Sequence, residues 1–191
     1  MTIIKNKVLW IILFSISIMT LGLFRICAVN KQYPSPQEIC FHANEDCIVS
    51  DYRIRLLDME LLSGEETQDI VSGMTLLYNI DGTPYPWEKQ KLVLATLEIE
   101  GTGNQDTMLD LTEIVVETKA WGNGMAGELF PVLNSETGSL YEKLEEGEKQ
   151  TIICPFLLAD NQFTEKDWKN LNAEKFSLIL NYYPEKIILS K

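Results

Sequence analysis

An uncharged apolar segment near the amino terminus constrains the fold of this chain more than any other feature. Residues Val8 to Phe24 (VLWIILFSISIMTLGLF) carry no charge and lie between Lys5 and Lys7 on one side and Arg25 on the other. With the four residues after Arg25, the segment approaches the ~20 apolar residues that cross a bilayer as a helix. A buried core helix is the alternative, but a helix that is apolar all round is not expected at the extreme end of a soluble domain. The pattern therefore predicts a membrane-spanning or export segment.

This segment is expected to be a signal-anchor over residues 1–29, with residues 8–29 in the cytoplasmic membrane. The two lysines before the apolar run favour a cytoplasmic amino terminus, so the rest of a single-pass protein would be extracellular. Ile26-Cys27-Ala28 matches a small-x-small cleavage site poorly. Phe24-Arg25-Ile26 also lacks the small residues that lipidation at Cys27 requires. We therefore favour an uncleaved anchor, with secretion after cleavage and lipidation as the alternatives.

The charge balance excludes several classes of partner. The chain has 191 residues, 16 Lys and Arg, 28 Asp and Glu, and a formal net charge of −12. The first 29 residues hold three of the basic side chains and no acid, so residues 30–191 carry −15. Nucleic-acid binding is not expected, because neutralising phosphates requires Lys and Arg. Docking on an anionic lipid surface is disfavoured for the same reason.

The remainder of the chain is predicted to be a linker followed by short strands. Residues 30–47 are predicted to form an extracellular linker, because Asn30 to Glu38 (NKQYPSPQE) is mostly polar and contains two prolines. Lys91 to Glu100 is apolar on both faces, which predicts a central strand. The alternation changes phase at Leu56-Leu57, which predicts a β-bulge or a change of sheet. About seven short strands over 48–191 predict an all-β domain, an antiparallel β-sandwich.

Local motifs predict two short helices between the strands. Ser63 and Glu66 form a capping-box pattern at the start of a helix over 64–72. Thr164 to Asp167 is expected to cap a second helix that runs through Trp168.

Other motifs predict a turn and core positions. Gly122-Asn123-Gly124 is expected to be a turn. Cys154 lies on the apolar face of a strand and is expected to be a buried, inert thiol. Phe176, Leu178 and Leu180 are expected to point into the core from a strand near the carboxyl terminus.

Four segments together resemble a known family. They are LVLATLEIEGTGN, GELFPVLN, KLEEGEK and the terminal FSLILNYYPEKIIL, in which NYYPEKIIL is the most specific part. Over roughly residues 50–191 the chain resembles the bacterial exported immunoglobulin-like domains of unknown function, which are related in architecture to telokin-like proteins. The resemblance implies an immunoglobulin-like β-sandwich over 48–191, placed after an amino-terminal signal or anchor. It implies no catalytic residue.

Cys40, His42 and Cys47 form the densest group of reactive side chains. A zinc site is disfavoured, because structural zinc takes four ligands and this spacing fits poorly, even if Glu45 or Asp46 completed the set. A disulfide between Cys40 and Cys47 is favoured outside the cell. The alternative is two unpaired thiols on a flexible stalk.

The acidic residues do not define a catalytic or metal site. Asn79 to Gly82 with Glu88 resembles part of an EF-hand loop, but Leu77 stands at the first ligand position and two prolines interrupt the loop, so a solvated turn is expected. The run Glu142 to Glu148 is expected to be a soluble face. Catalytic residues, metal ligands and cofactors are therefore not predicted.

Four aromatic residues lie near predicted loops and are the candidate partner-binding residues: Tyr85, Trp87, Trp121 and Phe130. The alternative for each is a place in the sandwich core. We expect a membrane-anchored extracellular domain at the bacterial cell envelope that binds an unknown protein or envelope partner and is not an enzyme. The alternative functions are a structural envelope component, a toxin-immunity protein and a hydrolase that uses carboxylates or a metal.

Overall fold

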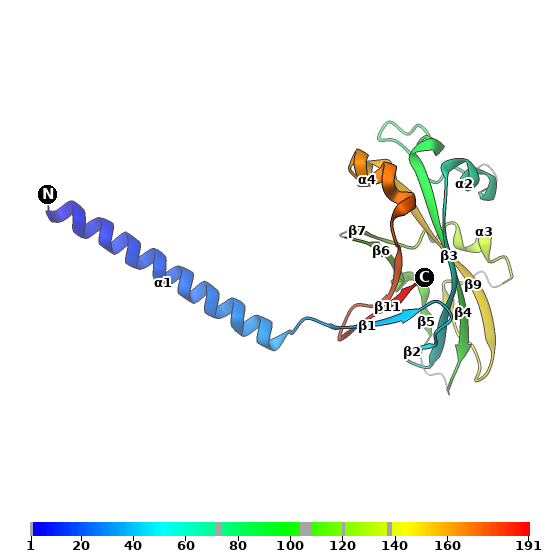
Figure 1. The fold of residues 1–191 in the computed structure, drawn as a ribbon, viewed down its shortest axis with the longest axis horizontal. Coiled ribbons are helices and arrows are strands. Elements are labelled where there is room, and N and C mark those ends of the chain that lie inside the picture. The colour runs from blue at the N-terminus through cyan, green and yellow to red at the C-terminus, as the bar shows by residue number, and fades with distance from the viewer. Residues whose placement is uncertain (1, 72–73, 104–107, 120, 137–138) are drawn as a thin grey trace. The chain divides into compact units, whose positions relative to one another are not determined.

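The computed structural model describes residues 2–71, 74–103, 108–119, 121–136 and 139–191. Two compact units make up the chain, one over Met1–Gln37 and one over Glu38–Lys191. The first unit is an extended helix, and the second is the β domain in Figure 1. Each unit is described by itself.

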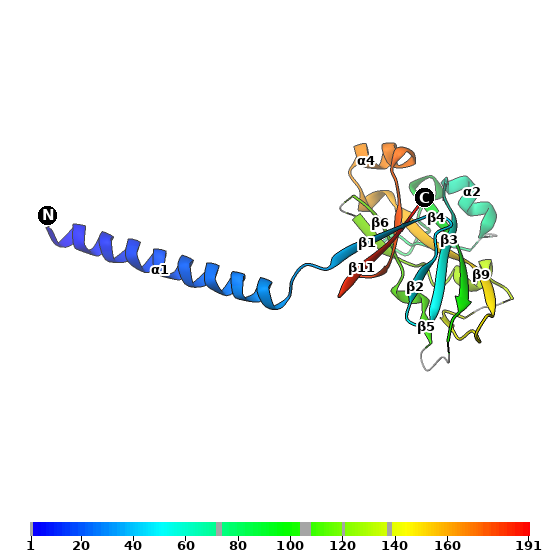
Figure 2. The same cartoon turned by 60° about the horizontal axis from the view of Figure 1, so that its bottom comes forward.

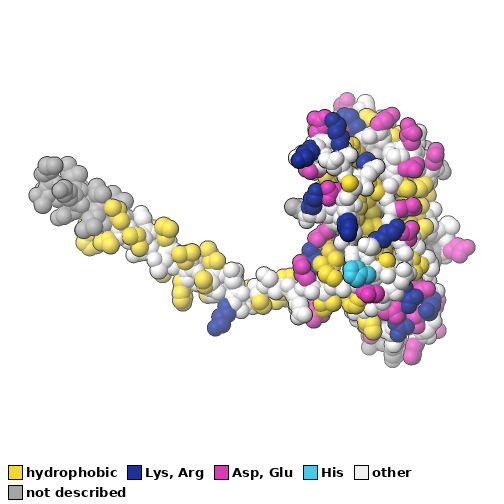
Figure 3. Space-filling view, in the orientation of Figure 1, with side chains coloured by type: hydrophobic (Ala, Val, Ile, Leu, Met, Phe, Trp, Pro, Cys, Tyr) yellow, Lys and Arg dark blue, Asp and Glu magenta, His cyan; other side chains and the backbone are white. Residues whose placement is uncertain are grey.

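The first unit contains helix α1 (Thr2–Gln32). At 1.5 Å per residue, its 31 residues extend about 46 Å, which exceeds the ~30 Å hydrocarbon core of a bilayer. Its span from Ile12 to Gln32 is apolar and unburied, and within the described residues α1 is the one helix long and apolar enough to cross a membrane. Figure 3 shows apolar side chains along this part of α1. The predicted amino-terminal apolar helix is therefore confirmed, and it extends to Gln32.

Two antiparallel sheets form the β domain, as the alternating sequence predicts. One sheet has the order β1-β11-β10-β6-β7, from strands Gln37–His42, Glu185–Ser190, Ser177–Asn181, Val115–Thr118 and Trp121–Gly124. The other has the order β2-β3-β4-β9, from Cys47–Val49, Tyr52–Leu62, Gln90–Gly101 and Lys149–Ala159. A two-stranded sheet joins β5 (Leu109–Asp110) to β8 (Tyr141–Glu142).

The main hydrophobic core lies between the two large sheets. From β10, Leu178 and Leu180 are buried in it, and Phe176 packs against its edge, as predicted. Cys154 on β9 is fully buried, also as predicted. Because inward-facing residues of both sheets share one cluster, the domain is a β-sandwich.

The long strand β4 is central in its sheet, between β3 and β9. Val93 and Leu97 face the main core, whereas Leu92 and Leu94 face a second apolar cluster on the outside of the sheet. The apolar sequence on both faces of this strand therefore correctly predicts its position. The register of β3 against β4 shifts after Leu56, so the predicted bulge is also confirmed.

Short helices complete the domain: α2 (Gly64–Ile70), α3 (Phe130–Leu133) and α4 (Glu165–Asn170), with 3-10 turns η1 (Trp87–Lys89), η2 (Leu111–Glu113), η3 (Asp160–Gln162) and η4 (Leu171–Ala173). Ser63 and Glu66 form the predicted capping box of α2. Thr164 caps α4 as predicted. Figures 1 and 2 show α2 and α4 at the same end of the sandwich.

The predicted linker over residues 30–47 is shorter in the structure. Strand β1 pairs with β11 and lies beside it in Figures 1 and 2, so the β domain includes residues from Glu38 onward. The Asn44 N–H donates to the Leu56 carbonyl over 2.9 Å, and Asp46 pairs with Arg55. The polar composition indicates a linker, but Phe41 of β1 packs against the main core of the sandwich.

The predicted turn at Gly122-Asn123-Gly124 is wrong, because these residues lie in strand β7. Thr118 pairs with Trp121 across the β6–β7 hairpin, and Lys119 lies in the turn between the two strands. Lys119 has a φ of 49°, a left-handed conformation that tight turns require. The two glycines alternate outward along β7, and this explains their exposure.

Candidate functional site

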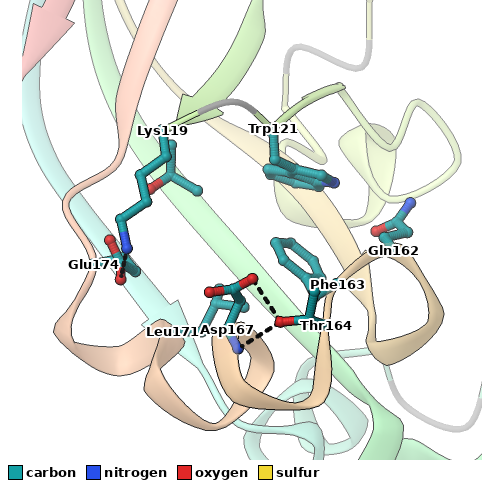
Figure 4. A pocket seen from close by; sticks show the side chains of 9 residues that line it. Lys119, Trp121, Gln162, Phe163, Thr164, Asp167, Leu171 and Glu174 are labelled. Carbon is teal, nitrogen blue, oxygen red and sulfur yellow. Dashed lines mark hydrogen bonds and ion pairs between the residues drawn. The ribbon is translucent and has the colours of Figure 1, made fainter.

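A pocket of about 340 Å³ lies between the β6–β7 hairpin and the segment that contains α4. Figure 4 shows it from close by. We call it the Trp121 pocket and define it by its lining residues: Thr118, Lys119, Trp121, Gln162, Phe163, Thr164, Asp167, Leu171 and Glu174.

Trp121 supplies an aromatic wall of this pocket. Alternation along β7 turns Trp121 and Asn123 inward and the two glycines outward. The Trp121 ring packs against Phe163, with ring centroids 4.8 Å apart and planes inclined by 39°. Trp121 is half-buried, so part of the indole remains available to a ligand.

The opposite wall is the segment from η3 to η4. Thr164 accepts a hydrogen bond from the Asp167 N–H and donates its hydroxyl to Asp167 Oδ2 over 2.6 Å, which fixes the first turn of α4. Leu171, at the carboxyl end of α4, is buried in the main core. From β4, Lys91 Nζ lies 5.1 Å from the Trp168 ring centroid and donates to Asn172, and burial lowers the pKa of Lys91. Contacts within the segment and contacts from Lys91 on β4 therefore both stabilise this wall.

The charges around the pocket are one cation and two carboxylates. The Lys119 ammonium lies 2.5 Å from Glu174 Oε1, and this hydrogen bond raises the pKa of Lys119. Asp167 adds a second carboxylate, and its charge also acts on Lys119. Figure 4 shows Lys119 with Glu174 on one side of the cavity and Asp167 with Thr164 on another.

Thr118 is a buried polar residue at the pocket. Its residue exposure is 7%, and within the described residues its hydroxyl oxygen has no hydrogen-bond partner. Buried hydroxyl groups in folded proteins are normally hydrogen-bonded, and an unpaired one requires an explanation. Because this oxygen has almost no accessible surface, the hydroxyl group does not open into the pocket.

Among the lining residues, the sequence predicts a binding role for Trp121 alone. Thr164 and Asp167 are predicted only as a helix cap, and Thr118 and Lys119 have no predicted role. Lining residues come from the β6–β7 hairpin and from the segment between β9 and β10, which are far apart in the sequence. No local sequence motif links the two segments, and the pocket forms only where they pack together in the fold.

Phe130 is not an exposed anchor, and its prediction as a partner-binding residue is wrong. Its side chain is fully buried in the main core, and the neighbouring Leu129 is fully buried in the second cluster. Both residues are buried because helix α3 begins here and packs against β9.

Trp87 and Tyr85 are half-buried and do not line the Trp121 pocket. Trp87 packs on the second apolar cluster. The Tyr85 hydroxyl donates to Asp160, which raises the pKa of Tyr85 and ties the loop before η1 to the segment that forms the pocket wall. The structure therefore assigns Trp87 a packing contact and Tyr85 a hydrogen bond near the pocket.

The loop before Tyr85 forms the turn that the sequence predicts in place of a calcium site. Asp81 accepts hydrogen bonds from the Thr83 N–H and hydroxyl, which lower the pKa of Asp81. Gly82 has a φ of 82°, which favours glycine. Ile80 is fully exposed at this turn.

The predicted disulfide between Cys40 and Cys47 is absent from the structure. Both are free thiols. Alternation along β1 turns Phe41 toward the core and Cys40 outward, whereas Cys47 on β2 is fully buried. Burial raises the pKa of Cys47 to about 11.

His42 contacts Ser190, and within the described ranges no group of three or more His, Cys, Asp and Glu is arranged to hold a metal.

Glu142 differs from the soluble face predicted for the acidic run. It is buried on β8, and its pKa is raised by burial and by the charge of Glu148. Glu145, Glu146 and Glu148 are exposed, as predicted. The register of β8 against β5 turns Glu142 inward.

The fold and the pocket define a class of protein: an antiparallel β-sandwich that follows an apolar helix long enough to span a membrane. The chain belongs to the family described as Domain of unknown function (DUF5028), whose model matches residues 30–187. The match begins before the β domain and ends within β11. None of the curated proteins compared with the chain matches it.

Several solved structures are similar to the chain. An uncharacterised β-sandwich protein from Clostridium difficile 630 has 12% identity and a TM-score of 0.42, over 81% of this chain and 93% of that one. The yjhA protein from Bacillus subtilis has 8% identity and a TM-score of 0.46, over 78% and 97%. A candidate lipoprotein from Staphylococcus aureus has 9% identity and a TM-score of 0.37, over 77% and 90%. At these values, the similarities identify no activity or partner for this chain.

Proposed function

We propose that this chain is a single-pass protein of the cell envelope, whose extracellular, immunoglobulin-like β-sandwich binds a protein partner at the Trp121 pocket. The pocket carries the proposal, because it joins a half-buried tryptophan to charged side chains in one concave site. Aromatic residues in such pockets supply much of the energy of protein interfaces. The apolar helix α1 supports attachment to a membrane.

Binding without turnover is the second part of the proposal. Cys154 is buried in the core, and burial raises its pKa to about 12, which disfavours the reactive thiolate. His42 is on β1 and is not among the residues that line the pocket. Among the described residues that line the Trp121 pocket there is therefore no cysteine or histidine for nucleophilic catalysis.

The test begins with crosslinking in intact cells. A photoreactive residue at Gln162, which lines the pocket, should crosslink to a specific protein, whereas the same residue at exposed Ser135 should not. The crosslinked protein is then purified, and its affinity for the full chain in detergent is measured. A structural envelope role predicts a partner from the cell wall machinery, and an immunity role predicts a secreted toxin.

Two matched tryptophan variants then test the pocket itself. Trp121→Ala should weaken binding of the purified partner by about 30-fold, since an interface anchor contributes about 2 kcal/mol or more. Trp87→Ala removes a half-buried tryptophan that does not line the pocket and should leave the affinity within about three-fold. Equal affinities for both variants, or a Trp121→Ala chain that no longer folds, would contradict the role of Trp121. Hydrolytic turnover by the full chain, lost in a carboxylate variant, would contradict binding without turnover.

A further inference from the structure

We propose that the Trp121 pocket receives the basic side chain of an arginine from its protein partner. This inference rests on the proposed function, because it names the chemistry that the same pocket selects. Two features of the pocket support it: its carboxylates and its aromatic wall.

The carboxylates of the pocket outnumber its cations. Asp167 and Glu174 both line the cavity, and Lys119 is the basic residue among the lining residues. The Lys119 side chain is 68% exposed, whereas that of Glu174 is 20% exposed. A flexible, exposed ammonium group is easily displaced from a sheltered carboxylate. Lys119 therefore occupies the position that a cation of the ligand would take.

Two carboxylates at one cavity suit a ligand that carries several hydrogen-bond donors. A guanidinium group carries five N–H donors in a fixed planar arrangement and no acceptor. It can donate to more than one carboxylate oxygen at the same time. An anionic ligand would instead meet Asp167 and Glu174 with the same sign of charge.

The aromatic wall suits a planar cation. Trp121 is half-buried beside Phe163, and tryptophan is the aromatic side chain that attracts cations most strongly. Guanidinium groups also stack on aromatic rings, which ammonium groups do less well. The −15 charge of residues 30–191 further favours the approach of a basic partner.

The experiment uses three peptides and the full chain in detergent. The peptides are acetylated and amidated pentapeptides, Ala-Ala-X-Ala-Ala, in which X is arginine, its neutral analogue citrulline, or glutamate. Binding is followed through the indole N–H signal of Trp121 in NMR spectra, with peptide up to millimolar concentration. The arginine peptide should shift this signal at lower concentration than the other two.

Charge variants test whether the pocket selects a positively or a negatively charged ligand. Asp167→Asn and Glu174→Gln should each lower the affinity for the arginine peptide by about two- to five-fold, which is the size expected for loss of a partly exposed ion pair. Lys119→Met should raise the affinity for the arginine peptide, because the competing cation is removed. The matched control is Lys169→Met, which makes the same change of net charge on α4 at a residue that does not line the pocket and should have no effect.

The outcomes distinguish this inference from the proposed function. Stronger binding of the glutamate peptide, or weaker binding to Lys119→Met, would show that the pocket selects an anion and would overturn the inference alone. No shift of the Trp121 signal with the arginine peptide would also overturn it. Failure of the proposed function would appear separately, as a purified partner whose affinity does not depend on Trp121.

Discussion

Trp121 and Phe163 pack their rings 4.8 Å apart, although one lies on β7 and the other lies between η3 and α4. Trp168 continues the contact, with its ring centroid 5.8 Å from that of Phe163. This row of aromatic rings holds α4 against the end of the sandwich. The Trp121 pocket is formed by the same contact, so its shape depends on the packing of two distant segments.

The topology of the chain can be tested with a single new thiol. In a chain with Cys27→Ser and Cys40→Ser, the remaining native thiols are Cys47 and Cys154, which are buried. Adding Ser135→Cys at an exposed position should then allow a membrane-impermeant maleimide to label intact cells. Labelling that occurs only after lysis would place the β domain in the cytoplasm and contradict the proposed extracellular location.

The state of the thiols can be counted directly. In the Cys27→Ser chain, isolated without reductant, a thiol reagent should react with Cys40 alone, because burial protects Cys47 and Cys154 and raises the pKa of both. Unfolding should expose the other two. If Cys40 and Cys47 were paired, the native chain would show no reactive thiol, and its mass would be about two daltons lower.

Leu178 should be essential to the sandwich core. Its side chain is fully buried between the sheets, so Leu178→Ala should lower the free energy of unfolding by about 2–5 kcal/mol. Ile80→Ala is the control, because Ile80 is fully exposed and its truncation should change stability by no more than about 0.5 kcal/mol. Urea unfolding of the full chain in detergent, followed by circular dichroism, measures both. Similar values for the two variants would contradict the inward orientation of Leu178.

Glu142 should make the stability depend on pH. Burial raises its pKa in the folded state, so the stability it contributes is complete below its ordinary pKa of about 4.3 and is lost as the pH rises through the folded-state value. Glu142→Gln should therefore be more stable, relative to the unmodified chain, at pH 7 than at pH 4.

The control for this prediction is Glu146→Gln, which makes the same change at an exposed neighbour in the acidic run. Its stability relative to the unmodified chain should stay constant over that range. The measurement is urea unfolding at a series of pH values. A Glu142→Gln chain that follows the unmodified chain at every pH would show that Glu142 is solvated in the folded state.

The sequence by itself determined the features that neighbouring residues control. The apolar run predicts helix α1, and Ser63 with Glu66 predicts the start of α2, because these signals depend on residues within one or two helical turns. The alternation along β4 predicts a central strand, because each face of a strand is recorded at every second residue. The phase change at Leu56-Leu57 predicts the bulge in β3 for the same reason.

Only the tertiary structure decided which distant residues meet and which side chains lose contact with water. Trp121 and Phe130 are both aromatic residues near predicted loops, but packing against Phe163 leaves the first half-buried at a pocket, and packing of α3 buries the second. Cys40 and Cys47 are close in sequence, yet the sandwich buries one and leaves the other exposed. The physical reason is that burial depends on how the two sheets and the segments between them pack, and residues far along the chain determine that packing.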